Sequence, residues 1–212
     1  MSHLTQRLPV LASFVMLVML GYVALLLRAG FEWSDEGLYL NLMRHPWLYG
    51  TSTSQAGLIY APLMNALNGN VWLLRLCNVA ALVAAFGALG FYALQPRLQG
   101  QGRALAALGL LSALGSLFYL QLWLPSPNYN ALNLQALALT LLLVLRARGT
   151  DSAFTAWMLW GLAGCALGLS FQAKPTSAAL AALLLVPCTL TAPQNKAVAL
   201  SGCQSNIRSK AC

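Results

Sequence analysis

The chain has 212 residues, of which 59% are hydrophobic and only 8% are charged, and its mean hydropathy is +0.68. Soluble globular domains carry about 25% charged residues, so this composition excludes that class and indicates a polytopic membrane protein. The formal charge of +8 comes from twelve Lys and Arg residues that stand singly between apolar runs. Because they form no basic patch or stripe, the net charge does not indicate a nucleic-acid partner.

Several apolar runs are each near the length of about 20 residues that a helix needs to cross a bilayer core. They cover residues 8–29, 71–95, 104–124, 130–146, 153–172 and 176–192. The runs are continuously apolar rather than alternating, which favours helices over a membrane barrel. We therefore predict an all-α, polytopic transmembrane helical bundle with a membrane domain over residues 1–192 and a basic tail over 193–212.

The distribution of cations orients the predicted bundle, because Lys and Arg are enriched in cytoplasmic loops. If the N-terminus is cytoplasmic, only Arg28, Arg44, Arg75 and Lys174 lie outside, and the other cations lie inside. We therefore expect a multi-pass protein of the plasma (inner) membrane with its N-terminus and its tail in the cytoplasm. All four outward cations stand at predicted membrane ends, where they could converge on one surface.

The long connection of the chain, residues 30–70, is an outer loop in this topology. It begins with FEWSDEGLY at residues 31–39, a stretch with three of the four acidic residues of the chain. Ser34 can cap a short helix whose first turn holds Asp35 and Glu36. Its apolar side would carry Leu38, Tyr39, Leu42 and Met43. We expect this helix to lie in the membrane interface, parallel to the membrane.

Two interpretations of Asp35 and Glu36 stay open at this point. The simpler one is that carboxylates favour a helix N-terminus and face water. As neighbours on a helix they point about 100° apart, so they cannot flank one bond as the two acids of a glycoside hydrolase do. Transfer from a lipid-linked sugar phosphate needs only one base, because the phosphate leaves without an acid, and it needs cations near the developing charge.

A family resemblance joins these features. The pattern Asp35, Glu36 and Tyr39, then Pro62 and Leu63, then Arg75 and Leu76, resembles the first outer loop of GT-C fold membrane glycosyltransferases of the protein O-mannosyltransferase and aminoarabinose (lipid A) transferase group. Further along the chain, the segment GLSFQAKP resembles a family segment that begins with Gly-Leu and leads to a Lys, which is Lys174 in this sequence. The resemblance covers residues 8–190 loosely.

This resemblance implies a function and a set of site residues. It implies transfer of a sugar from a polyprenyl-phosphate donor to a lipid or protein acceptor on the outer face. Asp35 would be the general base with Glu36 beside it, and Asp35 is also the residue that could bind a divalent metal ion. Arg75 and Lys174 would bind the donor phosphate. For both cations the alternative is that they only mark helix ends at the interface.

Two departures from the family qualify these expectations. Many relatives carry a Lys shortly before the Pro-Leu motif, where this chain has Tyr60. The predicted spans are also fewer than a complete enzyme of the group carries, so we expect a truncated N-terminal fragment. The alternatives are a small transporter or flippase, which would place ionisable groups near the middle of the bilayer, and an inactive assembly fragment.

Overall fold

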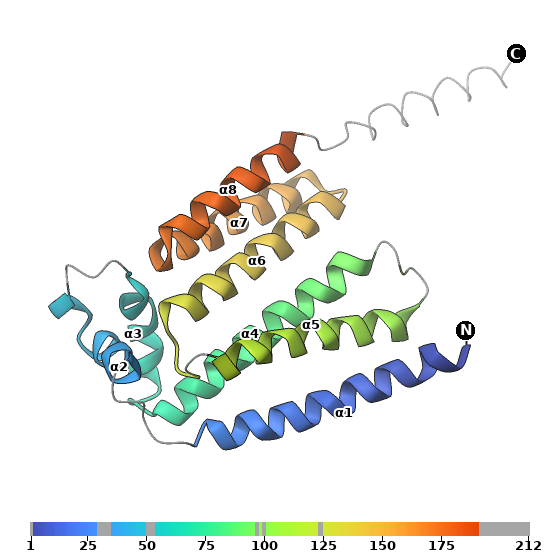
Figure 1. The fold of residues 1–212 in the computed structure, drawn as a ribbon. Helices are drawn as coiled ribbons and strands as arrows, with labels where there is room; N and C mark the ends of the chain where they lie inside the picture. The colour runs from blue at the N-terminus through green and yellow to red at the C-terminus, as the bar shows by residue number, and fades with distance from the viewer. Residues whose placement is uncertain are drawn as a thin grey trace, which may run out of the picture. The chain divides into compact units, whose positions relative to one another are not determined.

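The computed structural model describes residues 2–28, 35–49, 54–95, 98, 101–122 and 125–190. All regular elements within these ranges are helical, which confirms the predicted all-α fold class (Figure 1). They are α1 (Ser2–Leu26), α2 (Asp35–Arg44), the 3-10 helix η1 (Pro46–Tyr49), α3 (Ala56–Ala66), α4 (Val71–Leu94), α5 (Gly102–Leu122), α6 (Tyr129–Gly149), α7 (Ala153–Ala173) and α8 (Pro175–Leu190).

Each predicted apolar run lies mainly on a helix in the described part of the chain. By length and composition α4, α6, α7 and the Gly102–Tyr119 part of α5 can each cross a membrane, whereas Val10–Leu26 and Pro175–Leu185 are shorter apolar helical stretches. Large apolar side chains on these helices are exposed, among them Phe154, Trp157 and Leu183, with more than two thirds of each surface accessible. Exposure of this kind suits helices whose outer faces contact lipid, so the chain is a membrane-embedded helical protein.

Residues 1–179 form one compact unit, and a second unit begins at Leu180, within α8. In the first unit α1 packs on α5, α5 on α4, α4 on α6, and α6 on α7. The short helices α2 and α3 pack on each other, and α3 also contacts α4 and α6 (Figure 1). The two short helices therefore cover one end of the first unit, which we call the α2/α3 end.

Hydrogen bonds and a ring contact show which helix ends meet at the α2/α3 end of the unit and which meet at the opposite end. Arg75, near the start of α4, bonds to the carbonyl of Leu27, which follows α1. The Gln55 amide before α3 donates to the Gln172 carbonyl near the end of α7, at 3.0 Å. At the opposite end of α4, Arg146 stacks on Tyr92 at 4.4 Å from the ring centroid. The membrane helices thus alternate in direction, as the predicted topology requires.

Two buried clusters stabilise this arrangement. One lies between α1, α4 and α5 and contains Met16, Val23, Leu27, Val79, Leu82, Ala113, Leu114 and Leu117. The other joins α2 and α3 to the membrane helices and contains Met43, Ala56, Tyr60, Met64, Leu74, Leu132 and Ala173. Because the second cluster draws on α2, α3, α4, α6 and α7, hydrophobic burial ties the predicted outer loop to the bundle.

Helix starts follow local chemistry. The side chains of Asn70, Asn128 and Ser152 accept from backbone amides in the first turns of α4, α6 and α7, respectively, which satisfies donors that a helix N-terminus leaves free. The predicted helix over the acidic motif is confirmed as α2, with Asp35 and Glu36 in its first turn. Its predicted cap, Ser34, and the predicted basic tail at 193–212 lie outside the described residues.

Candidate functional site

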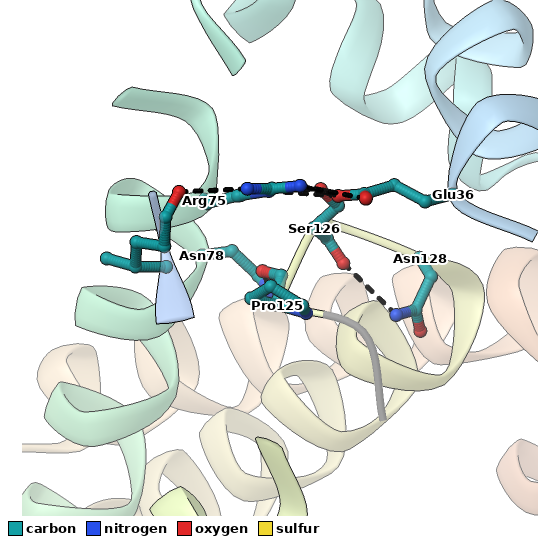
Figure 2. Close-up of polar contacts among 7 residues, drawn as sticks. Glu36, Arg75, Asn78, Pro125, Ser126 and Asn128 are labelled. Atoms are coloured by element: carbon teal, nitrogen blue, oxygen red, sulfur yellow. Dashed lines mark hydrogen bonds and ion pairs between the residues drawn. The ribbon is translucent and has the colours of Figure 1, made fainter. Parts of the chain in front are cut away.

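Glu36 and Arg75 form a buried ion pair between α2 and α4 (Figure 2). The pair is bidentate: Arg75 Nε lies 2.9 Å from Glu36 Oε1, and Nη2 lies 2.8 Å from Oε2. Only 1% of the Glu36 and 4% of the Arg75 surface is exposed. Two parallel charge-assisted hydrogen bonds fix the relative orientation of both side chains, so this contact sets the position of α2.

Two further groups contact the pair. Arg75 Nη1 donates to the Leu27 carbonyl at 2.8 Å, and its Nε also approaches Ser126 Oγ at 3.2 Å. The Ser126 hydroxyl donates to Glu36 Oε1. The guanidinium therefore joins the end of α1, the start of α2, the first turns of α4 and the segment before α6, as Figure 2 shows. Because the Arg75 guanidinium forms hydrogen bonds to several segments of the chain, its role is to hold these segments together, and its side chain is fixed in place.

Asp35 differs from its neighbour in both exposure and contacts. Its side chain is exposed, whereas Glu36 one position later is buried. Successive helical residues point about 100° apart, as expected from the sequence, so the packing of α2 can bury one carboxylate and leave its neighbour exposed. Within the described ranges no hydrogen bond or ion pair engages the Asp35 carboxylate. Of the two predicted catalytic acids, Asp35 is thus the one that an incoming molecule can reach.

Tyr39 lies one turn after Asp35 on the same face of α2 and lines a small cavity. The cavity has a volume of about 180 Å³ and lies between α2, the start of α3 and the start of α6. The Tyr39 and Tyr129 rings meet edge to face in its wall, with centroids 6.0 Å apart. Burial, the neighbouring Tyr129 and the negative charge of Asp35 raise the pKa of Tyr39 to about 12, so its phenol stays a proton donor at neutral pH.

A chain of uncharged polar groups lies beside the ion pair. Tyr60 on α3 donates to Gln135 Oε1 at 3.2 Å, and Gln135 Nε2 donates to Asn78 Oδ1 at 2.8 Å. Asn78 Nδ2 in turn donates to the Pro125 carbonyl at 3.0 Å. Burial raises the pKa of the Tyr60 phenol. A neutral donor directed at Gln135 therefore occupies the position at which the resembled family carries a Lys.

Lys174 is at the α2/α3 end but apart from the ion pair. It ends α7 as the C-cap residue, its amide donates to the Ser170 carbonyl at 2.7 Å, and its side chain is exposed. Arg75, the other predicted phosphate ligand, is almost fully buried against Glu36. The two predicted cations therefore share an end of the unit but have different surroundings, and only Lys174 presents its charge at the surface.

Among the described residues, the side chains near Asp35 do not form a set of ligands that fits a protein-bound metal ion. No group of three or more His, Cys, Asp or Glu side chains comes together in the part of the chain that the structure describes. The Glu36 carboxylate, which would be the natural second ligand, is occupied by Arg75 and Ser126. We therefore derive no chemistry through a metal at this site.

Sequence reasoning missed three contributors to the site, Ser126, Tyr129 and Gln135. Ser126 and Tyr129 belong to the segment PSPNY, residues 125–129, between α5 and α6, where we predicted no site residue. Asn128 within it caps α6 through a 2.9 Å bond from the Ala131 amide and also donates to the Ser126 carbonyl. A cap residue that follows Ser126 by two positions and directly precedes Tyr129, at a predicted membrane end, was the signal that could have identified this segment.

The chain matches no protein-family model, no curated protein and no solved structure in the comparisons made with each.

Proposed function

We propose that this chain is an integral membrane glycosyltransferase that moves a sugar from a polyprenyl-phosphate donor to a lipid or protein acceptor. The proposal places the N-terminus in the cytoplasm and the α2/α3 end on the outer face of the plasma (inner) membrane. One observation carries it: of two adjacent carboxylates at the start of α2, Glu36 is buried against Arg75, while Asp35 is exposed one helical turn before Tyr39, which lines the small cavity. The family resemblance of the same motif supports the choice of reaction.

In the proposed reaction Asp35 accepts the proton of the acceptor hydroxyl. The hydroxyl oxygen forms a bond to the anomeric carbon of the sugar, and the bond from that carbon to the phosphate oxygen breaks. The electron pair stays with the phosphate, which leaves as polyprenyl phosphate without needing an acid. One accessible base is sufficient for this step, and the site offers one.

The other predicted residues receive roles that agree with their surroundings. Glu36 and Arg75 position α2, because their charged groups are engaged with each other. Lys174 is the exposed cation that we assign to the donor phosphate. Tyr39 and Tyr129 would bind the sugar ring in the cavity, whose 180 Å³ is below the range of about 300–1,000 Å³ of drug-sized ligands and so suits a single small ring.

The test uses the whole chain reconstituted into liposomes with a radiolabelled polyprenyl-phosphate sugar and an outer-face acceptor. Asp35→Asn should lower the transfer rate by about 10²–10⁴-fold, the usual contribution of a general base, with membrane insertion unchanged. Asp151→Asn is the matched control, because Asp151 is an exposed carboxylate in the turn before α7, at the opposite end of the unit. Equal transfer by Asp35→Asn and the native chain would refute the assignment.

The transporter alternative has one observation in its favour, the polar chain of Tyr60, Gln135 and Asn78 between α3, α4 and α6. The side chains of this polar chain are uncharged, however, whereas ion-coupled transporters place ionisable groups within their membrane helices. Uptake of a solute into sealed vesicles without covalent transfer would favour this alternative. Binding of the donor without turnover would instead favour an inactive assembly fragment.

A further inference from the structure

A larger hollow lies at the other side of α2. It is formed by the end of α2, by η1 and by α3, and its volume is about 680 Å³, within the usual range of ligand sites. Arg44, which lines it, follows Asp35 by nine residues, a rotation of about 180° around the helix. We call this hollow the η1 groove. It is separate from the cavity beside Tyr39, although Met43 contributes to both.

The η1 groove combines apolar walls with exposed cationic and amide side chains. Leu58 and Pro62 of α3 line it, together with Trp47 of η1, whose surface is 84% exposed. Arg44, His45 and Asn65 line it too, and all three are exposed. No carboxylate lines it among the described residues. An anion placed there would meet donors and no competing negative charge.

Simpler explanations exist for single residues of this set. Trp is frequent at membrane interfaces without a specific ligand, and Arg at the last turn of a helix is stabilised by the C-terminal carbonyl groups. Neither explains why a hollow of this volume gathers two adjacent exposed side chains with N–H donors, Arg44 and His45, and an amide against an apolar wall at the α2/α3 end of the unit. The combination matches the two parts of a phospholipid, a charged headgroup and an apolar tail.

We propose that the η1 groove binds an anionic phospholipid, with its phosphate on Arg44 and His45 and an acyl chain along Leu58 and Pro62. Arg can donate two parallel hydrogen bonds to a phosphate, and the Asn65 amide can donate to an ester carbonyl. Trp47 sits at headgroup level, as interfacial Trp does. The site is independent of the proposed transfer reaction, because Asp35 lies on the other side of α2.

Native mass spectrometry of the full chain from mixed micelles tests the proposal. The chain should retain phosphatidylglycerol in preference to phosphatidylcholine with the same acyl chains. Arg44→Gln should lower the retained phosphatidylglycerol about fivefold, the factor expected for one cation beside an anionic lipid, and His45→Gln should lower it further. Arg28→Gln is the matched control, because Arg28 is an exposed cation at the same end of the unit but does not line the groove.

Several outcomes would overturn the proposal. One is equal retention of phosphatidylglycerol and phosphatidylcholine by the native chain, and another is an equal loss of retained phosphatidylglycerol in Arg28→Gln and Arg44→Gln. A third is a dimer mass in the native chain that disappears in Arg44→Gln, because it would indicate that a second copy of the chain occupies the groove. Competition by glycerol phosphate as effective as by the lipid would indicate a soluble ligand. If Arg44→Gln loses helical circular dichroism, Arg44→Lys decides: it keeps the charge but loses the two parallel hydrogen bonds, so it should retain less phosphatidylglycerol than the native chain and still prefer it to phosphatidylcholine. Equal retention of both lipids by Arg44→Lys would overturn the proposal.

Discussion

Removing one partner of the Glu36–Arg75 ion pair should cost more stability than the pair as a whole contributes. At the 2.7 Å separation of Arg75 Nη2 and Glu36 Oε1, and with an effective dielectric constant of about 20, their attraction is about 6 kcal/mol. Desolvation of the two ions, several kcal/mol each, offsets most of that attraction. A single replacement removes the attraction but leaves the other ion buried, so Arg75→Met should lower the free energy of unfolding by about 3–5 kcal/mol.

The double replacement is the informative variant. Glu36→Met with Arg75→Met leaves no buried charge, so it should lose less stability than the sum of the two single variants, by at least about 2 kcal/mol. Reversible unfolding of the purified chain in mixed micelles, followed by circular dichroism during a denaturant titration, gives the four free energies. Asp35→Asn is the control, because the exposed neighbour should change stability by no more than about 0.5 kcal/mol. Additive single losses, with a coupling below about 0.5 kcal/mol, would refute the reasoning.

Two further predictions concern α2. A Cβ on Gly57 would lie 2.9 Å from the Leu42 carbonyl oxygen, so Gly57→Ala should lower the free energy of unfolding by about 1–3 kcal/mol. The control is Gly37→Ala, whose Cβ meets open space and which should be neutral or stabilising by up to about 1 kcal/mol. Equal effects of the two variants in the micelle unfolding assay would contradict the close packing of α2 on α3. Because the pKa of Tyr39 is raised from its ordinary value of 10.0 to about 12, the folded chain keeps a proton that the unfolded chain loses, and stability should fall as the pH rises from about 10 to about 12. Tyr39→Phe should show a smaller fall over this window, with one less phenolate in the absorbance titration at 295 nm, and an unchanged slope would contradict it.

Much of the fold could be predicted from the sequence because its signals are local. Apolar runs of membrane length mark the spanning helices, and Asn128 and Ser152 mark the starts of α6 and α7. The short helix α2 could be predicted for the same reason, since carboxylates favour a helix N-terminus. That Asp35 and Glu36 point in different directions also follows from helical geometry alone.

The partners of the site residues could not be predicted in the same way. Arg75 was expected to face a donor phosphate, but Glu36, 39 residues earlier, already provides a negative charge for it. Which of two acids turns towards a distant cation depends on how α2 packs on the bundle, and no local pattern contains that information. The contact between Ser126 and Glu36 could not be predicted from local sequence either, because it depends on how the end of α5 and the start of α6 meet α2.

The ion pair has a consequence for the order in which the chain is made. Glu36 leaves the ribosome before either of its partners, and 90 residues separate it from Ser126. At about 5–20 residues per second, Ser126 follows about 5–20 s later. The counter-charge, Arg75, follows Glu36 by 39 residues, and until it is in place we expect the carboxylate to stay at the wet surface of the membrane, since burial without a counter-charge costs several kcal/mol. Docking of α2 thus comes after insertion of the helices that receive it, and assembly of the site is a late step in the biogenesis of this membrane protein.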